Sequence, residues 1–256
     1  MITDTREAYV KSELHNGVAT IEFFHPQSNA LPGKLLELLA QSIHSAGTDA
    51  EVKVILLRSA GDRAFCAGAS FDELAAIKTA DEGLQFFSGF AHVINAMRTC
   101  PKIIIGRVHG KCVGGGVGIV AAMDYAIATE AAEIKLSELS IGIGPFVVGP
   151  VVERKIGLSA FSQLAIDATM WRNGDWARRK GLFAELHPTT DAMDESIARL
   201  SFALAHSSTE AMAEIKKINW KGTEDWDKLL LERAAISGRL VTSEFSRKAI
   251  AGLRKK

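Results

Sequence analysis

The sequence predicts an α/β core followed by a helical C-terminal region. In the first part of the chain, short apolar segments alternate with stretches of helical periodicity, and this order indicates a layered core of strands and helices. From about Val147 onward the apolar spacing is mostly helical. Two glycine-centred stretches each lie between a predicted strand and a predicted helix, which marks them as candidate functional turns.

The first elements are predicted from alternation and turn chemistry. Tyr9 to Glu13 and Val18 to Phe24 alternate apolar and polar residues around His15-Asn16-Gly17, which indicates a β-hairpin. Helical periodicity follows at 33–46, and Val52 to Arg58 is predicted to be a short apolar strand.

The central elements follow in the order strand, glycine turn, helix. Two helices are predicted after the turn Phe65-Cys66-Ala67-Gly68-Ala69, and a further helix, ending at Ala122, after the triplet Gly114-Gly115-Gly116. The predicted segments are helices at Phe71 to Lys78 and Glu82 to Met97, and strands at Ile103 to Val108, Tyr125 to Thr129 and Glu133 to Leu136.

The architecture changes near residue 190. A weak strand is predicted at Phe183 to His187, and helical spacing then recurs in 190–204, 209–220 and 224–240. Because no repeat, low-complexity tract or flexible joint marks the boundary, we predict a core over residues 1–190 that continues directly into a helical region over 191–256.

Composition narrows the class of protein. The 256 residues are 47% hydrophobic, enough for a large buried core, and 30 basic residues balance 30 acidic ones. We therefore expect neither a nucleic-acid nor a membrane partner. The three cysteines form no CxxC pair, and the first residues lack a signal-peptide pattern, so we expect reduced thiols and a cytoplasmic protein.

The two glycine-centred stretches are the strongest chemical signal. A bare backbone at the start of a helix directs free N–H groups toward a negative oxygen, and two such turns can converge on one oxyanion. Tight packing between a helix and a strand explains the Gly114-Gly115-Gly116 triplet equally well from its position alone.

Glu138 is a candidate proton shuttle. It stands among apolar neighbours just before a glycine-containing loop, and an apolar cleft raises the pKa of a carboxylate toward neutral pH. The alternative is a helix-capping or salt-bridged glutamate, the commoner case for an isolated Glu. His109 is interpreted as a strand-end histidine with a satisfied hydrogen bond, and Asp124 as a residue that caps or anchors a strand.

Together these segments resemble the crotonase (enoyl-CoA hydratase/isomerase) superfamily over nearly the whole chain. Each stretch is ordinary by itself, and their joint order and spacing carry the resemblance. The matching stretches are Asn29-Ala30-Leu31, Ala64 to Ala69, Val108 to Gly116, Asp124, Ser137 to Pro145, and Gly157.

The resemblance implies a spiral of β-β-α turns with a C-terminal helical region that builds trimers, often paired into hexamers. It implies a coenzyme A thioester substrate and no metal or redox cofactor. The backbone N–H groups of Ala69 and Gly115 would be the two oxyanion donors, and Glu138 the acid/base.

The resemblance also implies a surface that binds the substrate. The segment Cys66, Ala67, Gly68 and Ala69 would lie along the adenine and pantetheine, with Arg254 or Lys255 near the nucleotide phosphates. The apolar run that begins at Pro145 is expected to line an acyl pocket. We assign to substrate binding Cys66, Ala67, Gly68, Ser70, Phe71, Gly118 and Pro145.

Two positions depart from the family pattern. Hydratases of the family carry a second glutamate where this chain has Gly118, and most relatives carry an aspartate where it has Ser70. A lone carboxylate can move a proton between carbons, whereas adding water normally requires a second group to orient the nucleophile. The sequence therefore favours double-bond isomerisation over hydration.

Other functions stay open at this point. Hydration remains available if another acid, for example from the turn Asp72-Glu73, reaches the site. Decarboxylation and thioester hydrolysis need only the same oxyanion hole, and dehalogenation is disfavoured because no aspartate nucleophile stands near residues 118 or 143. The non-enzymatic alternative is a coenzyme A-binding scaffold.

Overall fold

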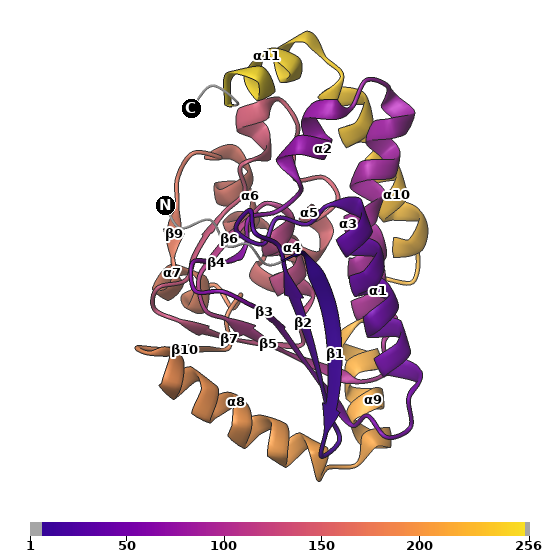
Figure 1. Ribbon diagram of the computed structural model, residues 1–256, viewed down its shortest axis with the longest axis vertical. Helices are drawn as coiled ribbons and strands as arrows, with labels where there is room; N and C mark the ends of the chain where they lie inside the picture. Colours follow the sequence, from indigo (N-terminus) through magenta and orange to yellow (C-terminus); the bar gives the residue numbers. More distant parts are fainter. Residues whose placement is uncertain (1–6, 254–256) are drawn as a thin grey trace.

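Two β-sheets and the helices around them make up the described part of the chain, residues 7–253 of the computed structural model (Figure 1). The larger sheet has six strands in the order β1-β2-β3-β5-β7-β10, and the smaller has four in the order β4-β6-β8-β9. The larger sheet consists of β1 (Tyr9–His15), β2 (Val18–Phe24), β3 (Val54–Ser59), β5 (Ile103–Val108), β7 (Tyr125–Thr129) and β10 (Glu185–His187).

The predicted hairpin is confirmed at the edge of the larger sheet. Strands β1 and β2 pair in antiparallel register from Tyr9 opposite Phe24 to His15 opposite Val18. Asn16 and Gly17 both have positive φ, at 48° and 78°, which the right-handed twist of a two-residue hairpin turn requires. From β2 onward every neighbouring pair in this sheet is parallel, so each strand needs a crossover connection to the next.

The smaller sheet supplies a second strand to each crossover that follows β3. Strands β4, β6 and β8 pair in parallel, whereas β9 pairs with β8 in antiparallel register. They comprise β4 (Ala64–Cys66), β6 (Lys111–Val113), β8 (Glu133–Lys135) and β9 (Arg172–Asn173). A strand of the large sheet, a strand of the small sheet and a helix thus recur in order, which is the expected β-β-α spiral.

Helices cover the sheets and form the whole chain from Thr190 to Leu253 apart from short connections. Those of the core are α1 (Gly33–Thr48), α2 (Phe71–Ala76), α3 (Ala80–Thr99), α4 (Gly115–Ala122), the 3₁₀ helix η1 (Glu138–Ile141), α5 (Gly149–Ile156), α6 (Leu158–Ile166) and α7 (Gly174–Arg179). The last four are α8 (Thr190–Ala205), α9 (Thr209–Asn219), α10 (Trp226–Val241) and α11 (Glu244–Leu253). The division at residue 190 into two regions stays a prediction.

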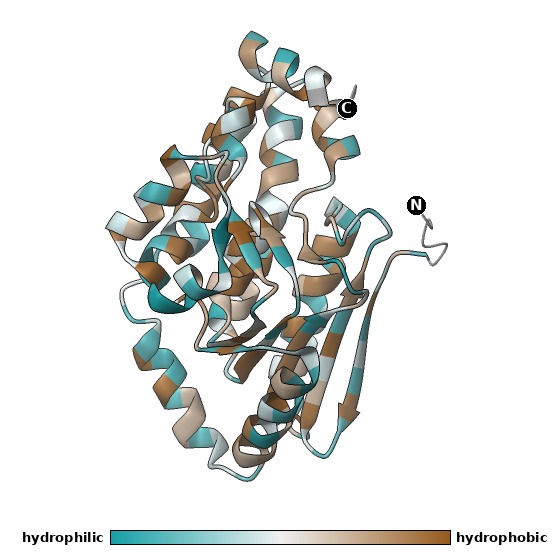
Figure 2. Ribbon diagram, turned by 90° about the vertical axis from the view of Figure 1, so that its left-hand side faces the viewer, coloured by the Kyte–Doolittle hydropathy of each residue, from teal (hydrophilic) through white to brown (hydrophobic). Residues whose placement is uncertain are grey.

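The core lies between the sheets and helices α1, α3 and α4. Phe23 and Phe65 are fully buried there and meet edge to face, with ring centroids 5.4 Å apart. On the far side of the larger sheet, Met193 and Ile197 of α8 pack on buried strand residues. Figure 2 shows the corresponding pattern, since the hairpin and the peripheral helices alternate between hydrophobic and hydrophilic residues. Within residues 7–253, no helix combines the length and apolarity needed to cross a membrane.

Helix α10 returns from the C-terminal region to pack on α3, and the two run side by side (Figure 1). Their backbones meet at two glycines: a Cβ atom added at Gly83 would lie 2.6 Å from Gly238 Cα, and one added at Gly238 would lie 2.5 Å from Leu84 N. Such close approach excludes any side chain at either position. Helix α10 is therefore held directly against the core.

Candidate active site

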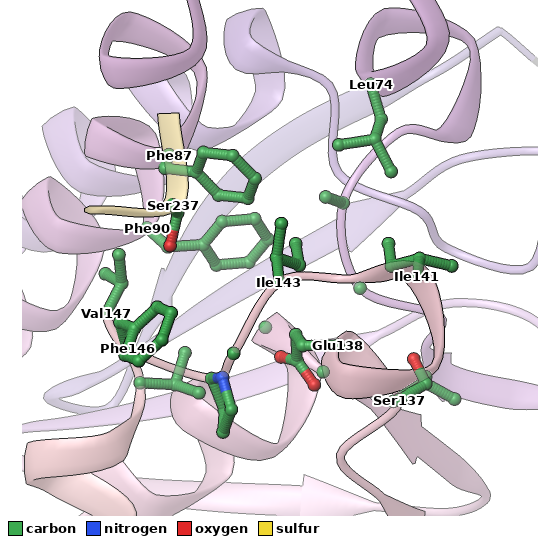
Figure 3. A pocket seen from close by; sticks show the side chains of 18 of the residues that line it. Leu74, Phe87, Phe90, Ser137, Glu138, Ile141, Ile143, Phe146, Val147 and Ser237 are labelled. Atoms are coloured by element: carbon green, nitrogen blue, oxygen red, sulfur yellow. The ribbon is translucent and has the colours of Figure 1, made fainter. Parts of the chain in front are cut away.

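A cavity of about 340 Å³ opens where β4, β6 and β8 of the smaller sheet end (Figure 3). Because parallel strands end at the same edge, the turns after them meet there. Both glycine turns and η1 line the cavity, and its remaining wall is mostly apolar. The apolar side chains are Phe71, Leu74, Phe87, Phe90, Val113, Ile141, Ile143, Phe146, Val147 and Val148.

The first glycine turn is held from behind by residues 28–31. Leu31 N donates to Gly68 O at 2.8 Å, and Ser70 N donates to Leu31 O at 3.3 Å, which is the pattern of a parallel bridge between Leu31 and Ala69. In such a bridge the N–H of Ala69 itself points to the side away from Leu31. The buried Asn29 side chain fixes the same segment by donating to Ala60 O at 2.7 Å and Ala64 O at 2.8 Å.

The second glycine turn begins helix α4. Gly114 adopts φ 51° and ψ −116°, and its N–H donates to Lys135 O at 2.9 Å. A Cβ atom at Gly68 would lie 2.8 Å from Val113 O and 3.6 Å from Gly115 N, and one at Gly116 would lie 2.6 Å from Cys66 O. The two turns therefore contact each other, and the contact requires glycine on both sides.

The amides of Ala69 and Gly115 lie in this shared cavity. Among the hydrogen bonds of residues 7–253, neither N–H has an acceptor in the protein. Gly115 is the first residue of α4, so its amide is one of those that the helix leaves without an internal partner. Two amides that have no acceptor in the described protein and belong to residues lining one cavity could both donate to an oxyanion there.

Glu138 begins η1 and directs its carboxylate into the same cavity (Figure 3). Its Oε1 lies 3.0 Å from the position that a Cβ at Gly114 would take, so the carboxylate rests on the second turn. Its Oε2 is buried without a hydrogen-bond partner in the described structure. Burial raises the pKa of Glu138 to about 7, so both of its protonation states are accessible near neutral pH.

Four of the predicted substrate-binding residues line the cavity: Ala67, Gly68, Phe71 and Pro145. Cys66 and Ser70 do not line it, and their role in substrate binding stays a prediction. Cys66 is fully buried and its Sγ accepts from Gly68 N at 3.4 Å. Ser70 caps α2, its Oγ accepting from Glu73 N at 3.4 Å, which is the structural reason for a small polar residue here.

Gly118 does not line the cavity either, and its surroundings bear on the reaction type. A Cβ atom at Gly118 would lie 2.4 Å from Val148 Cγ1 and 2.7 Å from Val148 Cβ. The direction in which a second acid would extend is therefore filled by Val148, which itself lines the cavity. Asp72 and Glu73 do not replace that acid, since neither lines the cavity and they accept from Gln27 Nε2 at 3.1 Å and Gly33 N at 2.8 Å.

His109 and Asp124 lie outside the cavity. The prediction that the His109 ring makes a hydrogen bond is wrong, because both ring nitrogens are buried without a partner among the described residues. Burial lowers the pKa of His109 to about 4. The anchoring role of Asp124 is confirmed: it precedes β7, accepts from Ile104 N at 2.8 Å and pairs with the buried Lys216 at 2.8 Å.

Sequence reasoning missed the residues that helices α3 and α10 bring to the cavity, namely Phe87, Phe90 and Ser237. Their helical spacing shows that they are buried but not which space they face. Lys135, at the end of β8, was also missed. Arg254 and Lys255, the candidates for the nucleotide phosphates, lie outside the described residues. No group of three His, Cys, Asp or Glu side chains in the described chain is placed to hold a metal ion.

The two-sheet spiral with its C-terminal helices defines a protein of the crotonase fold. The structure is similar to the crystal structure of an enoyl-CoA hydratase from Bacillus halodurans, with a TM-score of 0.88 at 22% identity over 95% of this chain and 99% of that chain.

Curated relatives are similar over a shorter stretch. A probable enoyl-CoA hydratase of Bacillus subtilis is 33% identical over 52% of this chain and 51% of its own length. Mitochondrial methylglutaconyl-CoA hydratase of Mus musculus is 31% identical over 62% of this chain and 50% of its own length. The chain thus matches about half the length of these relatives. The model of the enoyl-CoA hydratase/isomerase family matches residues 13–251, and the chain belongs to that family.

Proposed function

We propose that the protein is an enzyme that shifts the double bond of an acyl-CoA thioester, with isomerisation favoured over hydration. Family membership supports the thioester substrate. The observation that carries the reaction type is that Glu138 is the only carboxyl group lining the cavity in the described chain, with Val148 filling the place of a second one.

The proposed mechanism uses two amides and one carboxylate. The thioester oxygen accepts hydrogen bonds from Ala69 N–H and Gly115 N–H, so that negative charge on this oxygen is stabilised. The Glu138 carboxylate removes a proton from C2 of a 3-enoyl thioester, leaving a dienolate and a protonated Glu138. The same group then returns the proton to C4, which forms the 2-enoyl thioester and regenerates the carboxylate.

The Glu138 environment suits both steps. A pKa of about 7 means that the carboxylate is a stronger base than an exposed glutamate and its acid form is still populated at neutral pH. The reaction moves protons only, so coenzyme A enters as part of the substrate, and we propose no metal or redox cofactor.

The reaction type is tested by assaying purified protein with 2-enoyl-CoA and 3-enoyl-CoA thioesters and with Glu138→Ala. We expect conversion of the 3-enoyl to the 2-enoyl ester, little hydroxyacyl product, and loss of conversion in the variant. Rapid hydration that survives Glu138→Ala would overturn the single-base assignment. Release of free coenzyme A would instead identify a thioesterase, release of carbon dioxide from a carboxyacyl-CoA assayed in parallel would identify a decarboxylase, and tight binding without turnover would identify a scaffold.

We also propose a homotrimer, or a dimer of trimers, and a cytoplasmic location. Exposed large apolar side chains on the C-terminal helices support self-association, among them Phe202 on α8 and Ile215 and Ile218 on α9, which are 67%, 54% and 68% exposed. Light scattering of the purified protein tests the assembly, and a monomer at micromolar concentration would contradict it.

The free, buried state of all three cysteines supports a reducing compartment and hence the proposed cytoplasmic location.

A further inference from the structure

Ser237 brings a hydroxyl group into an aromatic part of the cavity. It projects from α10 and lies at the end of the cavity where Phe87, Phe90, Phe146 and Val147 gather, across from Glu138 (Figure 3). Only 1% of Ser237 is exposed to solvent. A buried hydroxyl in such surroundings is unfavourable unless it has a good hydrogen-bond partner.

The partner that Ser237 has within its own helix is poor. Its Oγ lies 3.5 Å from Arg233 O. In α3 the hydroxyls of Ser88 and Thr99 make the same bond to the preceding turn at 2.6 Å and 2.8 Å, and in α1 that of Thr48 makes it at 3.3 Å. At 3.5 Å the bond is at the limit of what stabilises a hydroxyl, so Ser237 retains most of its capacity to donate and accept.

Close helix packing does not by itself explain a serine here. The adjacent Gly238 meets Gly83 backbone to backbone, so α10 cannot move away to relieve the hydroxyl. Alanine would satisfy the same packing without burying a polar atom. The hydroxyl is therefore the feature that needs a function, and the cavity is the space it faces.

We infer that Ser237 recognises an uncharged oxygen, a hydroxyl or a carbonyl, on the part of the acyl group remote from the thioester. This inference rests on the proposed function, which places the thioester at the glycine turns and hence the acyl group against α3 and α10. A serine hydroxyl can donate to a carbonyl or accept from a hydroxyl. A remote carboxylate is disfavoured because the one cation lining the cavity in the described chain, Lys135, comes from the end of β8 and not from α3 or α10.

The inference is tested by calorimetric binding of saturated, unreactive thioesters. Hexanoyl-, octanoyl- and decanoyl-CoA are each compared with the same ester carrying a terminal hydroxyl group, on wild type, Ser237→Ala and Ser237→Thr. At the length that reaches Ser237, wild type should bind the hydroxylated ester about tenfold more tightly, since a net hydrogen bond is worth about one factor of ten. The ratio should fall to about one in Ser237→Ala and be restored in Ser237→Thr.

The outcomes separate this inference from the proposed function. Equal ratios in wild type and Ser237→Ala at every length, or a wild-type preference for the unsubstituted esters throughout, would overturn the role of Ser237 while leaving the proposed reaction intact. Failure to isomerise 3-enoyl esters would leave the binding ratios unaffected and contradict the reaction alone. Failure to bind any of these thioesters would overturn both. Thermal melts of the variants confirm that each is folded.

Discussion

The two sides of the cavity are built by different means. The side proposed to bind the thioester oxygen is main chain, formed by the turns at Gly68 and Gly116, which touch each other and leave no room for a Cβ atom. The side proposed to bind the acyl group is made of side chains from α3, α10 and the segment around Phe146. The comparison teaches that backbone geometry fixes the chemistry, whereas side-chain volume and polarity set what is accepted. We therefore expect substitutions on the first side to affect rate and those on the second to affect substrate choice.

Removing the carboxylate should have the largest effect. Glu138→Gln keeps the size of the side chain and its polar character but cannot take up a proton, so kcat should fall about 10²- to 10⁴-fold. The measurement is isomerisation of a 3-enoyl-CoA, followed at saturating substrate. Binding of a saturated thioester should change little, and a variant that keeps more than a tenth of the activity would show that Glu138 is not the base.

Distorting the oxyanion turn should have the next largest effect. Gly68→Ala combines φ 90° with a Cβ 2.8 Å from Val113 O, so the Ala69 amide must shift, and we expect a loss of about 10²–10³ in kcat, as for one lost oxyanion donor. The matched control is Gly61→Ala, where φ is 85° but no atom lies within 4 Å. If both variants lost the same activity, backbone strain alone would explain the result and contact between the turns would not matter.

The pH dependence should report Glu138. Because the proposed base is its carboxylate, whose pKa is about 7, kcat/KM should fall about tenfold per pH unit below 7 and level off above it. The stability should change in the opposite sense. A carboxyl whose pKa is raised from 4.5 in the folded state holds a proton that the unfolded chain has lost, so unfolding becomes easier as pH rises from 4.5 to about 7. The melting temperature should fall from pH 4.5 to about 7 in wild type but not for this reason in Glu138→Gln, which has no carboxyl group to titrate. If the two melting temperatures changed with pH in parallel across this range, the raised pKa of Glu138 would be contradicted.

Adding a side chain at Gly118 should have the smallest effect on rate, and its main effect should be on the stability of the fold. Gly118→Ala pushes a methyl group against Val148, and overpacking of this kind costs about 1–3 kcal/mol of stability. Combined with Val148→Ala, the added cost should shrink because the space has been cleared. Urea unfolding of the four proteins in this cycle gives the coupling energy, and strict additivity would mean that Val148 does not occupy that direction.

The sequence predicted the elements whose signals are local. Strands β5 and β7 have the predicted bounds, because each is a buried apolar run ended by a turn residue. The short strands β4 and β6 were not predicted, since three residues are too few to show alternation and their pairing joins segments far apart in the chain.

The candidate site divides in the same way. The glycine turns and Glu138 could be found from the sequence, because a run of glycines and a glutamate among apolar neighbours are both local signals. The sequence did not show that Cys66 and Ser70 are buried away from the cavity, because it does not show which side of a turn faces the cavity. Phe87, Phe90 and Ser237 reach the cavity only through tertiary packing, which no spacing encodes.

The contact between Gly83 and Gly238 has a consequence for the length of substrate. Two helices that touch through their main chains lose close packing if they separate to admit a longer ligand, so we expect the end of the cavity near Ser237 to act as a stop rather than an elastic wall. Affinity should then rise with each added carbon up to one length and drop abruptly at the next, and shifting that limit would require trimming an aromatic ring rather than loosening a helix.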